Sequence, residues 1–108
     1  EEGAVGEVQN RRHWDKILKI AGSRLVVVDF TATWCGPCQR IKNDYHRLAA
    51  TYSDVVFLQV DVDENDDVAA KCRVTSMPTF HFYQQGNKVH QVTGANIPAV
   101  EEAIQRLQ

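Results

Sequence analysis

The stretch Leu25-Val26-Val27-Val28-Asp29-Phe30-Thr31-Ala32-Thr33-Trp34-Cys35-Gly36-Pro37-Cys38 joins an apolar run to two cysteines. Near-continuous hydrophobicity predicts a strand buried on both faces, and the residues after it open a helical pattern. A thiol at a helix start is easier to ionise, and the thiolate is the nucleophile in disulfide chemistry. Cys38 lies three residues on, about one helical turn away on the same side. The pair can therefore close into a disulfide and reopen, which predicts a redox site.

The position of each cysteine predicts its part in the reaction. Cys35 is nearest the helix start, so we expect its thiolate to attack a substrate disulfide and form a mixed disulfide. Cys38 is the predicted resolving thiol, which attacks Cys35, releases the reduced substrate and leaves the intramolecular bond. Because the helix must bury one side against the sheet, we expect Cys38 to lie deeper and to stay protonated until needed.

Asp29 is a carboxylate inside a run of Val and Phe. Buried carboxylates are rare unless they are paired or functional. Burial should raise the pKa of Asp29, so that it can exchange a proton near neutral pH. We predict that Asp29 accepts the proton of Cys38 during the resolving step. The alternative is that Asp29 faces a surface crevice and only bonds a neighbour.

Strands and helices alternate along the rest of the chain. The order βαβαβαββα is predicted, with strands at residues 5–8, 25–31, 55–60, 79–83 and 88–93, and helices over 14–21, from the cysteine pair to 52, over 68–72 and over 96–107. Residues 84–87, with Gly86, form the predicted hairpin turn. Asn96 is the predicted cap of the last helix. Because no linker or repeat divides the chain, we expect a single domain over residues 1–108, with 1–4 a flexible lead.

Composition narrows the possible classes of function. The chain has 108 residues, is 44% hydrophobic and carries a net charge of −2, with no basic patch that would bind nucleic acid. Its longest apolar run is too short to span a membrane. The first residues lack the basic and apolar regions of a secretory signal, although the missing initiator Met is compatible with a trimmed leader. Three cysteines are too few for a secreted disulfide scaffold, so we expect a cytoplasmic location.

The pentapeptide Trp34-Cys35-Gly36-Pro37-Cys38, the strand before it and the element Met77-Pro78-Thr79-Phe80 together resemble the thioredoxin family. The match runs from about Val5 to the C-terminus. It implies an α/β fold, the thioredoxin fold, with a central mixed five-stranded β-sheet flanked by four α-helices and a final antiparallel hairpin. It also implies a protein-disulfide reductase in electron transport and cell redox homeostasis. No bound cofactor is implied, because NADPH reduces such proteins through a separate thioredoxin reductase.

The resemblance also assigns partners and the residues around the cysteines. The partners are the reductase and diverse disulfide-containing protein substrates, and we expect a monomer. Gly36-Pro37 between the cysteines goes with a reducing member of the family. Trp34 is expected to shield the thiolate and contact substrates, unless it simply fills the core. Met77-Pro78 is expected to be cis and to face the cysteines, with the Met77 backbone pairing with substrate as an added strand. Gly94 is expected on the loop that rims this surface, unless it only serves a turn.

Two residues depart from the family pattern. Asn43 stands where many thioredoxins carry a helix-kinking proline, so we expect the helix after the cysteines to be straighter. Gln59 stands where bacterial members have Lys and some animal members have Glu. A charged partner of Asp29 is therefore missing at this position, which predicts different tuning of its proton transfer.

Other chemistry finds less support. Cys72 is either a regulatory or intermolecular thiol or a helix-face residue without a role. The acidic run at residues 61–67 lacks the spacing of a calcium loop, and the cysteine pair lacks two further ligands for zinc, so we expect no metal. The alternative to a reductase is an interaction module whose partner binding is switched by the redox state. A folding factor of a secretory compartment is a third possibility, which Gly36-Pro37 and the missing signal disfavour.

Overall fold

The structure, a computed structural model, describes residues 4–108, so residues 1–3 of the predicted flexible lead lie outside the described part. The elements along the chain are β1 (Val5–Glu7), α1 (Arg11–Ala21), β2 (Val26–Thr31), α2 (Gly36–Arg40), α3 (Lys42–Thr51), β3 (Val56–Asp61), α4 (Asp66–Lys71), β4 (Thr79–Gln84), β5 (Asn87–Thr93) and α5 (Ile97–Leu107).

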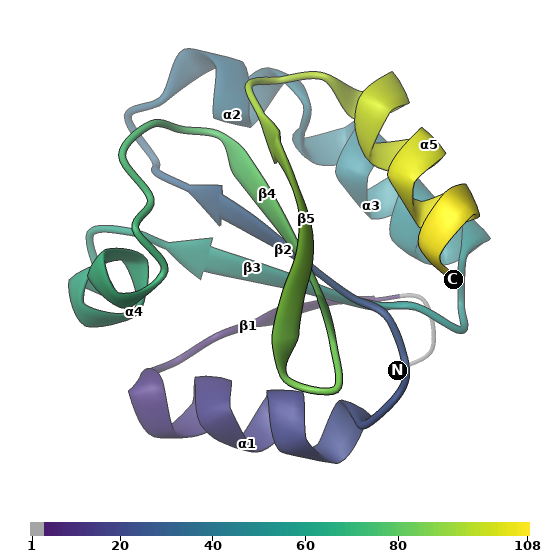
Figure 1. Ribbon diagram of the computed structural model, residues 1–108. Helices are drawn as coiled ribbons and strands as arrows, with labels where there is room; N and C mark the ends of the chain where they lie inside the picture. Colours follow the sequence, from purple (N-terminus) through teal and green to yellow (C-terminus); the bar gives the residue numbers. More distant parts are fainter. Residues whose placement is uncertain (1–3) are drawn as a thin grey trace.

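The five strands form one mixed sheet in the order β1-β3-β2-β4-β5 (Figure 1). Strand β2 pairs parallel with β3 on one side and antiparallel with β4 on the other. Strands β4 and β5 form the antiparallel hairpin, and Gly86 in its turn has a positive φ of 79° that favours glycine. The predicted mixed sheet is confirmed.

Helices cover both faces of the sheet, α1 and α4 on one and α3 and α5 on the other (Figure 1). All six residues of β2 are buried. Successive side chains of a strand point to opposite faces, so Val26 and Val28 enter the cluster on the α1 side while Leu25 and Val27 enter the cluster on the α3 side. The unbroken apolar run of β2 thus supplies both halves of the core.

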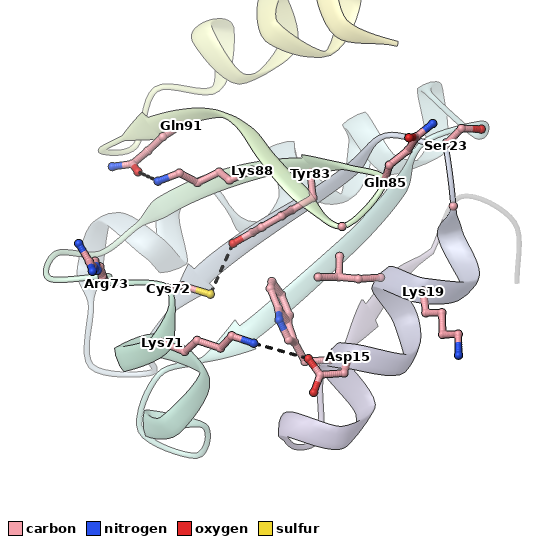
Figure 2. A pocket seen from close by; sticks show the side chains of 14 residues that line it. Asp15, Lys19, Ser23, Lys71, Cys72, Arg73, Tyr83, Gln85, Lys88 and Gln91 are labelled. Carbon is pink, nitrogen blue, oxygen red and sulfur yellow. Dashed lines mark hydrogen bonds and ion pairs between the residues drawn. The ribbon is translucent and has the colours of Figure 1, made fainter.

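Aromatic rings dominate the cluster on the α1 face. The ring of Trp14 lies 5.3 Å from that of Tyr83, nearly perpendicular to it, and 6.3 Å from that of Phe30. The Tyr83 hydroxyl donates to the Sγ of Cys72, 3.4 Å away (Figure 2). Cys72, at the end of α4, therefore packs against this cluster and lies apart from the other two cysteines.

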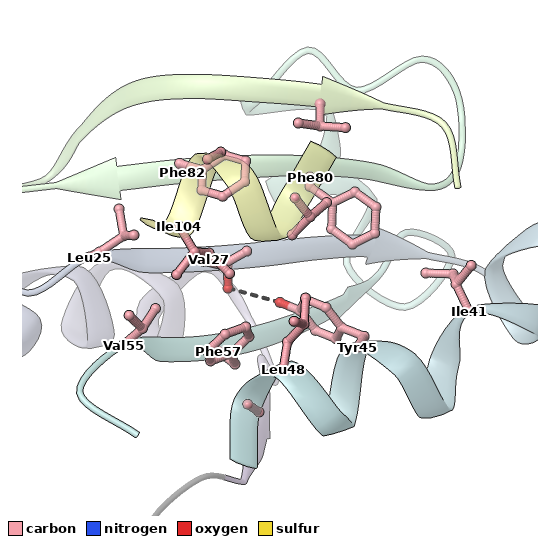
Figure 3. Close-up of a cluster of buried hydrophobic side chains, with 14 residues drawn as sticks. Leu25, Val27, Ile41, Tyr45, Leu48, Val55, Phe57, Phe80, Phe82 and Ile104 are labelled. Atoms are coloured by element: carbon pink, nitrogen blue, oxygen red, sulfur yellow. Dashed lines mark hydrogen bonds between the residues drawn. The ribbon is translucent and has the colours of Figure 1, made fainter. Parts of the chain in front are cut away.

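Tyr45 ties α3 to the sheet on the opposite face. Its ring contacts those of Phe57 and Phe80, with centroids 5.5 and 5.6 Å away (Figure 3). Its buried hydroxyl lies 2.8 Å from the carbonyl oxygen of Leu58 and 3.1 Å from that of Val27. Because these carbonyls belong to β3 and β2, one side chain fixes the height of α3 over both strands.

The helix after the cysteines differs from the prediction. A single helix to residue 52 was expected, and Asn43 in place of proline predicted a straighter one; both expectations are wrong. The backbone leaves the helix at Ile41 (φ −97°, ψ 2°), which separates α2 from α3 and gives five helices in residues 4–108 instead of four. Ile41 is buried in the cluster around Tyr45, while Cys38 is buried in a small cluster with Ala32. The bend lets the two segments bury side chains in different places.

Side-chain caps begin the first and last helices. Asn10 accepts from the backbone N–H of His13 at 2.8 Å, and Asn96 accepts from that of Ala99 at 3.1 Å. The predicted cap at Asn96 is confirmed. Within the described residues, no helix is both long enough and apolar enough to cross a membrane.

Replacing Tyr45 by Phe should lower the free energy of unfolding by about 1–2 kcal/mol, because the hydroxyl bonds to two buried carbonyls are lost. Urea unfolding measures this value. Tyr52→Phe is the matched control, since the Tyr52 hydroxyl bonds Glu101 and Gln105 near the surface, and its loss should cost only about 0.5 kcal/mol. Equal losses in the two variants would contradict the anchoring role of Tyr45.

Candidate active site

The cysteine pair lies where β2 ends and α2 begins. Cys35 is the N-cap residue of α2, and Pro37 occupies its first turn. Cys35 and Cys38 form a disulfide, with their Cα atoms 5.3 Å apart. The pair closes as its spacing predicts, at the end of the most buried strand of the sheet.

The backbone N–H of Cys38 donates to the Sγ of Cys35 at 3.2 Å. This N–H belongs to the first turn of α2 and directs its positive end at the sulfur. A donor at this distance favours negative charge on Cys35 once the disulfide is reduced. Cys38 is 2% exposed and Cys35 5%, so Cys38 is the deeper of the two, as expected.

The residues before β4 form the opposite wall of the site. The Met77–Pro78 peptide bond is cis, as expected. The carbonyl oxygen of Met77 lies 3.7 Å from the Sγ of Cys35, although the two residues are 42 positions apart. The Met77 side chain packs against the small cluster formed by Ala32 and the two cysteines. The backbone of Met77 therefore faces the disulfide directly.

Gly94 joins the site through Pro78. Its N–H donates to the carbonyl oxygen of Pro78 at 2.9 Å. Its φ is +97°, which favours glycine, and a Cβ atom there would meet no atom within 4 Å. Its conformation accounts for glycine in the turn, and its contact brings the loop before α5 beside Pro78.

Trp34 is 65% exposed, so the alternative that it fills the core is wrong. Its indole Nε1 donates to Oδ2 of Asp63 at 2.8 Å. The bond between Trp34 and Asp63 was not predicted from the sequence. A signal for it exists, because Trp34 follows β2 and Asp63 follows β3, and the ends of parallel strands meet at one edge of a sheet. The indole therefore stands in solvent with a fixed orientation.

Asp29 faces a small cavity of about 70 Å³, which Cys38, Lys42 and Gln59 also line. The side chain of Asp29 is 3% exposed, and its Oδ1 has no hydrogen-bond partner among residues 4–108. Burial raises the pKa of Asp29 to about 7, and repulsion from the Glu7 carboxylate adds to the rise. The predicted rise is confirmed, and Asp29 shares its cavity with Cys38.

Sequence reasoning missed two charged residues near this cavity. Lys42 lines it from the first turn of α3, and its place four residues after Cys38 was an available signal. Glu7 accepts a hydrogen bond from Nε2 of Gln59 at 3.3 Å. Only the pairing of β1 with β3 reveals Glu7, because it is 22 positions from Asp29 along the chain.

Among the other sequence candidates, the acidic run borders this site, since Asp61 lines the cavity of Asp29 and Asp63 bonds Trp34, whereas Cys72 lies apart from it. Residues 4–108 contain no group of three or more His, Cys, Asp or Glu side chains that could hold a metal ion. In the acidic run, Asp61 accepts from the N–H groups of Asp63 and Glu64, at 2.9 and 3.3 Å, and so shapes a turn. A hollow of about 870 Å³ beside α1 is lined by Trp14, Tyr83 and Cys72, away from the disulfide (Figure 2).

Comparisons with known proteins agree with this geometry. The thioredoxin family model matches residues 5–106. The thioredoxins of Equus caballus and Homo sapiens are 50% and 48% identical over 103 residues, which is 95% of this chain and 98% of each relative. The X-ray structure of Fasciola hepatica thioredoxin superposes with a TM-score of 0.94 and 39% identity, over 96% of this chain and all of that one. Nicotiana alata thioredoxin NaTrxh gives 0.94 at 36% identity, over 100% of this chain and 96% of that one.

The raised pKa of Asp29 predicts how stability changes with pH. The folded protein holds this proton up to a pH of about 7, whereas an unfolded chain releases it near pH 4. The free energy of unfolding should therefore fall as the pH rises between these values, by on the order of 4 kcal/mol. Asp29→Asn cannot ionise and should lack this fall, so it should be the more stable protein at pH 8.

Urea unfolding of the oxidised protein at pH 4.5, 6 and 8 measures the effect. Asp54→Asn, which changes an exposed carboxylate, serves as the matched control and should keep the wild-type pH dependence. Parallel curves for the wild type and Asp29→Asn would show that Asp29 does not carry the buried proton.

Proposed function

Because this chain belongs to the thioredoxin family and is a thiol–disulfide oxidoreductase, we propose a directional reductase cycle in which Cys35 attacks and Cys38 resolves. NADPH-dependent thioredoxin reductase restores the dithiol. The observation that carries the proposal is the disulfide at the start of α2, with the Cys38 N–H on the Cys35 sulfur and the Met77 carbonyl opposite.

In the first step, the Cys35 thiolate attacks one sulfur of a substrate disulfide. A Cys35–substrate bond forms, the substrate S–S bond breaks, and the leaving thiolate takes a proton from water. The N–H of Cys38, 3.2 Å from the Cys35 sulfur, supports the thiolate. Cys38 has no comparable donor to its sulfur among the described residues, which favours Cys35 as the attacking group.

In the second step, Asp29 accepts the proton of the Cys38 thiol across their shared cavity. The Cys38 thiolate then attacks the Cys35 sulfur, the Cys35–substrate bond breaks, and the second substrate thiolate leaves. A base is most effective when its pKa lies near the working pH, and burial places the pKa of Asp29 at about 7. The cycle closes when the reductase delivers two electrons and two protons to the disulfide.

The surface around the disulfide suits extended protein substrates. The Met77 backbone carries polar groups beside Cys35, and a substrate strand can pair with it by strand addition. Trp34 offers an exposed flat ring beside the site. Gly94, next to Pro78, has free space where a Cβ atom would stand and leaves room for a substrate chain. These contacts use backbone and apolar groups, so they fit diverse disulfide-containing proteins rather than one.

A monomer working in the cytoplasm fits this role. In that compartment reductases keep thiols reduced, so a dithiol donor is continuously regenerated. The chain brings every residue assigned to the cycle to one end of its own sheet, and no second copy is needed to complete the site.

Insulin-disulfide reduction coupled to NADPH and thioredoxin reductase tests the roles of the cysteines. We expect Cys35→Ser to lose at least 99% of the activity, on the order of a hundredfold, because no attacking thiolate remains. Cys38→Ser should accumulate a mixed disulfide with substrate, visible by mass spectrometry. Cys72→Ser is the matched control and should keep wild-type turnover, since Cys72 packs on the α1 face.

Two other results would contradict the assigned roles of the cysteines or the reductase function. A mixed disulfide trapped in Cys35→Ser instead of Cys38→Ser would reverse the two roles. A Cys35→Ser protein that still performs its task in cells lacking the wild-type chain would favour the interaction module over the reductase.

Asp29→Asn should slow the resolving step because the acceptor for the Cys38 proton is removed. On the general scale of acid–base catalysis we expect a loss of about tenfold to a hundredfold near pH 7, shrinking at high pH where hydroxide removes the proton. Stopped-flow release of a fluorescent substrate thiol from the preformed mixed disulfide measures this step. Unchanged turnover from pH 6 to 9 would show that Asp29 is not the acceptor.

A further inference from the structure

The geometry points to Glu7 as a positioning residue for Asp29, acting from the sheet edge across β3 through the row Glu7–Gln59–Asp29. This inference rests on the proposed role of Asp29 as the proton acceptor of Cys38. Glu7 touches neither cysteine nor substrate in this scheme. Its part is to set the electrostatic environment of the buried carboxyl group.

The register of three neighbouring strands places these residues in one row. Glu7 of β1 pairs with Gln59 of β3, and Gln59 pairs with Asp29 of β2. Side chains of residues paired in register point to the same face of the sheet, and strands lie about 4.8 Å apart, so Glu7 and Asp29 start about 10 Å from each other. Their face is the one that α3 covers.

Gln59 connects the exposed end of the row to the buried end. Its Nε2 donates to Oε1 of Glu7 at 3.3 Å, and the same side chain lines the cavity that Asp29 faces. The bond holds the Glu7 carboxylate along the row instead of letting it turn into solvent. The residue between the two carboxyl groups is uncharged, so it holds Glu7 in place without neutralising it.

Other titratable and charged groups also face Asp29, but the raised pKa of Asp29 comes from burial and from the charge of Glu7. From α2 and α3 these are Cys38, Lys42 and the hydroxyl-bearing Tyr45, and from the end of β3 Asp61. From β4 the in-register partner is the apolar Phe80.

Burial is the larger cause of the raised pKa of Asp29, and the charge of Glu7 is the second. Glu7 lies at the exposed edge. Its own pKa is raised, chiefly by partial desolvation, although the bond from Gln59 opposes the rise. A charge that costs less at the edge thus acts on a charge that is costly in the interior.

This arrangement has a consequence for the resolving step. A negative neighbour makes Asp29 hold a proton more tightly and therefore makes it a stronger base toward the Cys38 thiol. Without Glu7, Asp29 ionises at lower pH and takes the thiol proton less readily. In the pH–rate profile of the resolving step, the rise at acid pH should then move to lower pH. The maximal rate at higher pH should fall.

The direct test is the titration of Asp29 in the oxidised protein, where Cys35 and Cys38 do not titrate. The carboxyl ¹³C shift of labelled Asp, followed by NMR from pH 4 to 9, reports its pKa. Glu7→Gln keeps an acceptor for Gln59 and removes only the charge. We expect the pKa of Asp29 to fall by about 0.5 to 1 unit, a three- to tenfold change in its ionisation constant.

Control variants show whether the change in the pKa of Asp29 comes from the lost charge of Glu7 or from a change in structure. Glu102→Gln, on the exposed side of α5, should leave the pKa of Asp29 unchanged. Glu7→Asp should recover part of the wild-type value. In 1 M salt the difference between the wild type and Glu7→Gln should shrink, because the effect crosses a partly exposed region. A wild-type pKa of Asp29 in Glu7→Gln overturns the inference.

Kinetics then distinguish this inference from the function it rests on. In stopped-flow measurements of mixed-disulfide resolution, Glu7→Gln should lower the apparent pKa of the pH–rate profile. The decrease should equal the decrease in the pKa of Asp29 measured by NMR. In the Asp29→Asn background, Glu7→Gln should change nothing further. If Asp29→Asn leaves resolution unchanged, the proton role of Asp29 fails, while a lowered pKa still supports the electrostatic effect of Glu7. An additive effect in the double variant overturns the route through Asp29.

Discussion

The complete burial of β2 is the constraint on which the rest of the molecule depends. Strands on both sides and helices on both faces enclose its six residues. Such a strand cannot move without disrupting both clusters of the core, because protein interiors are close-packed. It therefore provides a rigid base for Cys35 at its end. It also withdraws Asp29 from water, which raises the pKa of that carboxyl group.

The site is assembled at the end of β2 from segments that are distant along the chain. Met77 arrives from the loop before β4, and Asp63 from the loop after β3 fixes the indole of Trp34. A backbone hydrogen bond from the N–H of Gly94 to the carbonyl oxygen of Pro78 brings the loop of Gly94 to the same end. The contacts of Met77 and Gly94 use backbone groups, whereas Trp34 is held by a side chain. This suits a surface that must accept many protein substrates while keeping its two sulfurs in one geometry.

The support of the cysteines differs from a long continuous helix. The break at Ile41 leaves α2 with five residues, and at its start the N–H of Cys38 donates to the Cys35 sulfur. The same break places Lys42 at the start of α3, beside the cavity of Asp29. Two helical segments with separate packing thus serve the two halves of the reaction: α2 holds the sulfurs, and the start of α3 borders the proton acceptor.

The sequence by itself determined the strands, the order of elements apart from the division of the second helix, the cysteine pair and the burial of Asp29, because each follows from local periodicity or from residue types in an apolar run. Family resemblance added the cis bond at Met77-Pro78. Only the tertiary structure decided the break at Ile41, the exposure of Trp34 and its bond to Asp63, and the row from Glu7 to Asp29. The row from Glu7 to Asp29 and the bond of Trp34 depend on which strands pair and in what register, and the break at Ile41 depends on where α2 and α3 pack. These choices are made by packing between residues far apart in the chain, which local periodicity does not describe.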